Sequence, residues 1–106
     1  MTQKEKHITA LIKAKINQKD SLAEVILFSS HARGQADSSS DWDILILLNQ
    51  TVVNRKTQTE YSEELFDIEL EIGESISSLV LSKIDWEDRY SFTPLYQNIK
   101  RDGISL

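Results

Sequence analysis

One apolar run limits the possible folds more than any other feature of this sequence. Residues 42–48 read Trp-Asp-Ile-Leu-Ile-Leu-Leu, so an unbroken apolar stretch follows a single aspartate. A strand with one face in water alternates apolar and polar residues, whereas a strand covered on both faces is apolar throughout. The run is far too short to cross a bilayer. It predicts a buried strand in a sheet with other elements packed on both faces.

The rest of the chain predicts the elements that surround this strand. Apolar residues recur at helical spacing near the N-terminus and again in the middle of the sequence, and short β-branched runs alternate with them. We expect helices over residues 4–19, 54–72, 83–90 and 94–102, and further strands over 23–28, 76–82 and 104–106. Residues 29–40 are expected to form a polar loop with one helical turn. This order predicts an α/β (α+β) fold, a small mixed β-sheet covered by helices, in a single domain spanning residues 1–106.

Composition excludes several functions. The 106 residues contain no cysteine and two histidines, which rules out disulfides, thiolate metal sites and a histidine cage. The net charge of −5 argues against binding double-stranded DNA, because such proteins neutralise phosphates with lysine and arginine. The N-terminus lacks the apolar segment of a signal peptide, and the sequence predicts no membrane span. A cytoplasmic location is the expectation.

Charge is unevenly distributed along the chain. Residues 1–20 carry five lysines against two acids, whereas residues 61–80 carry six acids and no base. The acids recur at intervals of three and four, so a helix would display them as a stripe. We interpret the stripe as a solvated face. A docking surface for a basic partner, or for the lysine-rich helix of another copy, is the alternative. An exposed end strand would also favour a homo-oligomer joined through the sheet edge.

The segment from residue 28 to residue 43 carries the chemistry. Alternate residues of a strand point to the same face, so Asp41 and Asp43 are expected to lie side by side. Two neighbouring carboxylates repel unless a cation lies between them, and Mg²⁺ prefers a few carboxylates together with substrate phosphates. Before them, Ser29 and Ser30 begin a tight turn in which amides and hydroxyls can approach a polyphosphate. Arg33 adds a planar cation suited to phosphate oxygens. The pattern predicts a site for a magnesium-bound nucleoside triphosphate.

This segment closely resembles the signature of the nucleotidyltransferase superfamily that includes DNA polymerase beta. In that signature a hydrophobic residue, glycine, and glycine or serine are followed about ten residues later by Asp-x-Asp and an apolar strand. Here Phe28 supplies the hydrophobic residue, Ser30 the serine, and Asp41-Trp42-Asp43 the acidic pair. Arg33-Gly34 matches the Ala-Arg-Gly of the minimal, single-domain bacterial members, which include antitoxins of toxin–antitoxin systems.

The resemblance implies a function and a set of residues. Its members transfer a nucleoside monophosphate from an NTP to a protein or small-molecule hydroxyl, with Mg²⁺ as cofactor and ATP as the expected nucleotide. Minimal members often act with a helical HEPN-type partner protein. The implied metal ligands and catalytic residues are Asp41 and Asp43, and the implied nucleotide-binding residues are Ser29, Ser30, Arg33 and Gly34. The alternatives are a catalytically impaired module of the same fold that binds nucleotide or a partner, and a fragment whose site a partner chain completes.

Two positions depart from the family pattern. Ser29 replaces the usual glycine, and a positive φ at this turn would strain a serine. Active members usually carry a third carboxylate on the next strand, whereas residues 76–82 contain no acid. Glu69, Glu71 and Glu74 lie before that strand, and we assign none of them this role. His31 is expected to be a solvent-facing loop residue.

Overall fold

The computed structural model describes residues 1–37 and 40–106. The helices are α1 (Gln3–Lys19), α2 (Ser29–Ala32), α3 (Arg55–Ile72), α4 (Lys83–Asp88) and α5 (Pro94–Asp102). The strands are β1 (Glu24–Phe28), β2 (Trp42–Leu48), β3 (Ile76–Ser82) and β4 (Ile104–Ser105). The predicted order of elements is confirmed, including the single helical turn inside the polar loop.

Local sequence signals explain where the long helices begin and end. Thr2 and Glu5 form a capping box at the start of α1, in which each side chain accepts a hydrogen bond from the other residue's amide. Asn54 caps α3 by accepting from the amide of Thr57. Gly73 ends α3 in the left-handed conformation, with φ 71°, which a residue without Cβ adopts easily.

The four strands form one mixed sheet in the order β3-β2-β1-β4. β2 lies inside the sheet, antiparallel to β1 and parallel to β3. The short β4 continues the sheet beyond β1 in an antiparallel sense. The parallel pair is joined through α3, a connection that places this helix against one face of the sheet.

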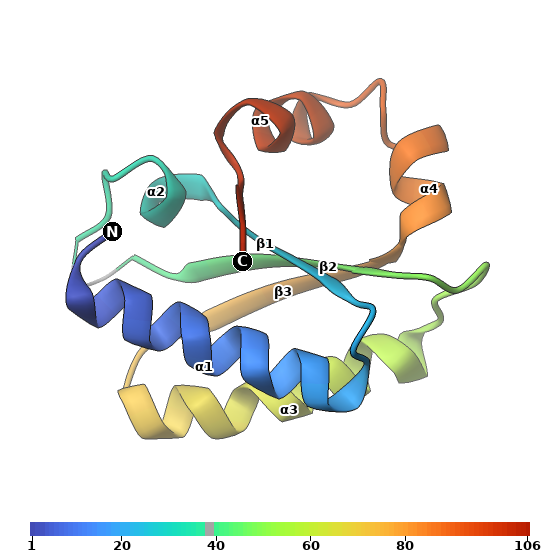
Figure 1. Cartoon of the computed structure of the whole chain (residues 1–106). Coiled ribbons are helices and arrows are strands. Elements are labelled where there is room, and N and C mark those ends of the chain that lie inside the picture. The colour runs from blue at the N-terminus through green and yellow to red at the C-terminus, as the bar shows by residue number, and fades with distance from the viewer. Residues whose placement is uncertain (38–39) are drawn as a thin grey trace.

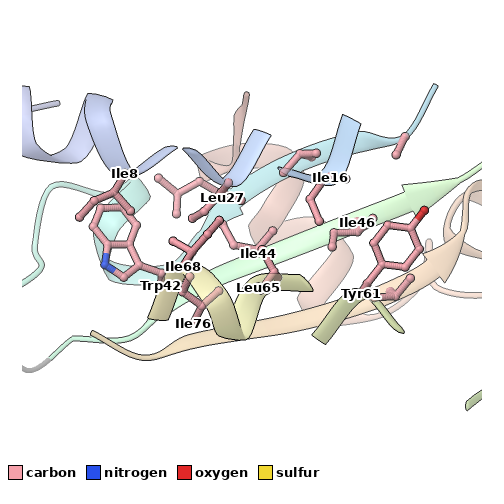
Figure 2. Packing of buried hydrophobic residues seen from close by; sticks show 14 of the residues in the cluster. Ile8, Ile16, Leu27, Trp42, Ile44, Ile46, Tyr61, Leu65, Ile68 and Ile76 are labelled. Atoms are coloured by element: carbon pink, nitrogen blue, oxygen red, sulfur yellow. The ribbon is translucent and has the colours of Figure 1, made fainter. Parts of the chain in front are cut away.

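Helices cover both faces of the sheet, as the buried strand predicted. α1 and α3 lie on one side, and α4 and α5 lie on the other (Figure 1). Alternate residues of β2 face the two layers. Ile44 and Ile46 pack with Leu65 of α3 in the larger core cluster (Figure 2), whereas Leu45 packs with Trp86 of α4 in the second. Both faces of β2 are therefore buried, which explains why its sequence does not alternate between apolar and polar residues.

Ion pairs link the lysines of α1 to the acids of α3 within the same chain. The contacts are Lys15 with Glu64 at 3.7 Å and Asp67 at 3.4 Å, and Lys19 with Glu60 at 3.4 Å. Part of the acidic stripe thus neutralises the neighbouring helix and is not a fully solvated face. Each of these partly exposed pairs contributes about 0–1 kcal/mol. Their main consequence is that the lysine-rich helix already has its acidic partner in this chain.

Across residues 1–37 and 40–106, no helix combines the length and the apolar character needed to span a membrane.

Candidate functional site

Strand pairing brings the serine turn and the acidic pair to the same end of the sheet. In the antiparallel ladder of β1 and β2, the Cα atoms of Phe28 and Asp43 are direct partners. Ser29 and Ser30 follow Phe28 without a gap, and Asp41 lies one residue before β2 begins. The serine turn and the acidic pair, which a loop separates in the sequence, therefore meet at the same end of the sheet.

The serine turn has an unusual backbone conformation. Ser29 has a φ of 62°, in the left-handed region that residues with a Cβ rarely adopt. The condition under which serine is less favourable than glycine at this position is therefore met in the structure. The backbone then closes on itself, because the amide of Arg33 donates to the Ser29 carbonyl at 3.1 Å and the amide of Gln35 donates to the Ser30 carbonyl at 2.9 Å. Gly34, with a φ of 70°, ends the turn.

The Arg33 side chain lies at the surface beside this turn. Its residue is exposed, and Nε donates to the Oε1 atom of Gln35 at 3.3 Å. A surface guanidinium can reorient at small energetic expense, because no buried contact has to break. The Arg33 guanidinium can therefore change its orientation without disturbing the core.

Asp41 directly precedes β2, and Asp43 is the second residue of this strand. By strand alternation Asp43 shares its face with Leu45, which packs against α4 and α5. Asp41 is exposed and Asp43 is half-buried. Within the described residues neither carboxylate forms an ion pair or a side-chain hydrogen bond. Carboxylates without an ion-pair partner among the described residues are the kind of oxygen ligand that a hard cation such as Mg²⁺ takes.

Trp42, between the two aspartates, faces the opposite layer. It is buried, it packs in the larger core cluster near Ile8 (Figure 2), and its Nε1 donates to Glu74 Oε1 at 3.2 Å. Glu74 also pairs with Lys4 of α1 at 2.8 Å. The hydrogen bond from Lys4 lowers the pKa of Glu74, and the bond from Trp42 lowers it further. Glu74 therefore anchors the tryptophan to α1 and lies on the opposite side of the sheet from Asp43.

His31 was expected to face solvent, and this expectation is wrong. The imidazole is 6% exposed and stacks on the indole of Trp42, with ring centroids 3.7 Å apart and an angle of 11° between planes. Its Nδ1 lies 3.4 Å from Glu5 Oε2 and its Nε2 lies 3.3 Å from the Ser40 carbonyl. The sequence carried no signal for this contact, because the two rings meet only when α2 folds back over β2. His31 connects the serine turn to the segment that carries the aspartates.

The position beside Asp43 on β3 holds a serine. The parallel register pairs Asp43 with Ser77, so these two residues occupy the same face of neighbouring strands. Ser77 is exposed and carries no charge. Among the described residues, no group of three or more His, Cys, Asp or Glu side chains is arranged to hold a metal ion. The site thus presents one pair of carboxylates, and the neighbouring strand adds a hydroxyl.

Comparison with known proteins agrees with this architecture. The profile of the family described as polymerase beta, nucleotidyltransferase matches residues 11–106. The chain therefore belongs to the polymerase beta nucleotidyltransferase family and has the fold of its minimal members. No curated protein sequence matches the chain significantly.

A solved structure shares the fold. It is a chain of a structure described as a toxin–antitoxin with AMP-PNP, with a TM-score of 0.59 and 21% sequence identity. The match covers 88% of this chain and 70% of that one. At this identity the likeness concerns the fold.

Proposed function

We propose that this chain binds a magnesium–nucleoside triphosphate where β1 and β2 meet and transfers the nucleoside monophosphate to a hydroxyl of a protein or small molecule. The observation that carries the proposal is the pairing of Phe28 with Asp43, which sets the serine turn beside the unneutralised carboxylates. Family membership supports the reaction class.

Each group in the site has a role in this reaction. The amides of the turn, the hydroxyls of Ser29 and Ser30, and the guanidinium of Arg33 would hold the triphosphate. Asp41 and Asp43 would hold Mg²⁺, which supplies charge neutralisation for the phosphates. The acceptor oxygen bonds to the α-phosphorus, the bond from that phosphorus to the pyrophosphate oxygen breaks, and the hydroxyl proton passes to water. The protein mainly positions groups in such a transfer.

A second function is favoured by Ser77. Because the residue beside Asp43 is a serine and not a third carboxylate, the site could bind nucleotide without turning it over. In that case the domain acts as a nucleotide-responsive binding module. Ser77→Asp separates the two functions, since it would add transfer activity to a binding module and would raise an existing rate only modestly.

We also propose a partner protein for this chain. The structure with a similar fold contains a toxin–antitoxin and AMP-PNP, which supports ATP as the nucleotide and an antitoxin role. The helical HEPN-type partner is what the family resemblance implies. A cytoplasmic location follows from this role. A tyrosine, serine or threonine hydroxyl of such a partner would be the acceptor.

Thermal unfolding with and without Mg–ATP tests the nucleotide site. At a ligand concentration about 100-fold above Kd, binding adds roughly 2.7 kcal/mol and raises Tm by about 10 °C for a domain of this size. Asp43→Asn should abolish the shift that magnesium adds. Asp88→Asn, at an exposed acid at the end of α4, is the matched control and should keep it. The proposal fails if no NTP shifts Tm, or if both variants respond alike. Labelling of an acceptor by α-labelled ATP then distinguishes transfer from binding.

A further inference from the structure

β3 ends the sheet with an edge that is open in the described part of the chain. It pairs with β2 on one side, and the sheet order places no strand on its other side. The sequence of β3, Ile-Ser-Ser-Leu-Val-Leu-Ser, contains no charged residue and no proline. Monomeric proteins usually protect such edges with charges, prolines or covering elements, because open peptide groups pair readily with another strand. This edge lacks the usual protection within its own strand.

The side of α3 next to this edge carries an exposed aromatic ring and a shallow hollow. Phe66 is 54% exposed, and the hollow is lined by Gln58, Thr59, Ser62, Glu63, Phe66 and Glu69. The Oγ atoms of Ser62 and Ser78 lie 3.2 Å apart, so the hollow borders the middle of β3. The open edge and the exposed face of α3 therefore form one continuous surface, which we call the β3 edge surface.

Charges on the β3 edge surface are complementary to the same surface of a second copy. Arg55 and Glu69 lie on opposite sides of Ser62, each seven residues away along the helix. Seven residues are about two helical turns, so all three project toward similar directions. A twofold axis near Ser62 would bring Arg55 of one copy beside Glu69 of the other. Within the described residues, neither side chain has an ion-pair partner in its own chain.

The same axis also places the aromatic ring. Phe66 and Gln58 are each four residues from Ser62. A twofold axis near Ser62 therefore sets Phe66 of one copy against the Gln58 end of the hollow on the other. Because Ser62 contacts Ser78 near the middle of β3, this axis also aligns the two β3 edges in antiparallel register. The same twofold rotation thus produces the pairs of Arg55 with Glu69, the contact of Phe66 with the hollow, and the antiparallel pairing of the two β3 edges.

We propose that the β3 edge surface binds a second copy of this chain across a twofold axis near Ser62 and Ser78, which joins the two sheets into one. A twofold interface is self-complementary, and the equal spacing of Arg55 and Glu69 about one residue is the pattern that such an interface requires. Ser77 at the start of β3 borders the nucleotide site, but the surface centred on Ser62 and Ser78 contains none of the proposed metal-binding or nucleotide-binding residues, so the proposal does not depend on nucleotide binding.

Sedimentation of the purified full chain over a range of concentrations tests the proposal. The wild type should sediment as a concentration-dependent dimer. Arg55→Glu and Glu69→Arg each reverse two symmetric contacts, and each should raise the dimer dissociation constant by about tenfold or more. The double variant restores opposite charges across the axis and should recover affinity close to that of the wild type. Glu71→Arg, at an exposed acid on the same helix, controls for net charge and should dimerise normally.

An apolar substitution provides a second test. Phe66→Ala should weaken the dimer, whereas Phe92→Ala removes a ring that is 92% exposed and lies between α4 and α5, and should leave it unchanged. A monomer at every concentration overturns the proposal. So does a dimer that neither charge reversal weakens, since its copies must then meet through another surface. The Mg–ATP shift in Tm should persist in Glu69→Arg, so the two proposals can fail separately.

Discussion

Replacing Ser29 with glycine should stabilise the protein. Among the described residues Ser29 is the one non-glycine residue with a positive φ, at 62°. The left-handed conformation raises the energy of a residue with a Cβ by about 1–2 kcal/mol. Glycine loses about 0.5–1 kcal/mol more backbone entropy on folding than a residue with a side chain. Taken at the middle of the two ranges, the difference predicts that Ser29→Gly raises the free energy of unfolding by roughly 0.5–1 kcal/mol.

Thermal unfolding followed by circular dichroism measures this effect. For a chain of 106 residues, 1 kcal/mol shifts Tm by roughly 4–5 °C, so Ser29→Gly should raise Tm by about 2–5 °C. The matched control is Ser30→Gly. This substitution makes the same chemical change one residue later in α2, where φ is not positive, and should lower stability by about 0.5–1 kcal/mol.

Opposite signs for neighbouring serines are the expected result. If Ser29→Gly lowers Tm, or if the two substitutions shift Tm equally, then backbone strain is not what distinguishes this position. The Mg–ATP shift of Ser29→Gly should persist, because the turn keeps its conformation, but it should be no larger than that of the wild type, because the Ser29 hydroxyl is lost.

Two further substitutions test contacts around Trp42. His31→Ala removes the ring stack and the two polar contacts of the imidazole and should lower the free energy of unfolding by about 2 kcal/mol, whereas His7→Ala at an exposed position should change it little. If urea unfolding shows the same change in the free energy of unfolding for His31→Ala and His7→Ala, the stack on Trp42 does not contribute to stability. The hydrogen bonds of Glu74 lower the pKa of its carboxyl in the folded state. The ionised carboxylate therefore stabilises the fold at pH values above its unfolded-state pKa, near 4.5. This stabilisation is lost as the pH falls through the lower pKa of the folded state. The loss of stability between pH 7 and about pH 3 should therefore be smaller for Glu74→Gln than for Glu71→Gln; equal losses would contradict the assignment.

The elements were predictable because their signals are local. The helix from Arg55 to Ile72 has a capping asparagine before it and a glycine after it, and both signals act within a few residues. The apolar run of the central strand predicted that both of its faces are buried. For Ser29 the sequence indicated only a condition, that a positive φ at this turn would strain a serine where the family pattern has glycine, and the structure supplied the φ. The functional roles of the aspartates and of the turn stay predictions.

The errors concern contacts between distant segments. His31 reads as a loop residue, and its burial depends on a tryptophan eleven residues away that approaches only when the hairpin closes. The acidic stripe on residues 60–74 reads as a solvated face, and its pairing with Lys15 and Lys19 depends on α1 lying beside α3. The acidic stripe itself is periodic, but nothing in the sequence shows that its partner is α1 of the same chain, and the contact between His31 and Trp42 has no signal at all, because in both cases the partners belong to different elements.

The sequence by itself determined which segments form helices and strands, their order, and the burial of both faces of the central strand. Each of these follows from interactions between near neighbours along the chain. The tertiary structure decided which residues share a face and an edge. It set Phe28 against Asp43, placed Ser77 beside Asp43 on the neighbouring strand, and brought His31 onto Trp42. These pairings depend on strand register, which is set by the packing of the whole core, and a shift by one residue would turn every side chain to the other face.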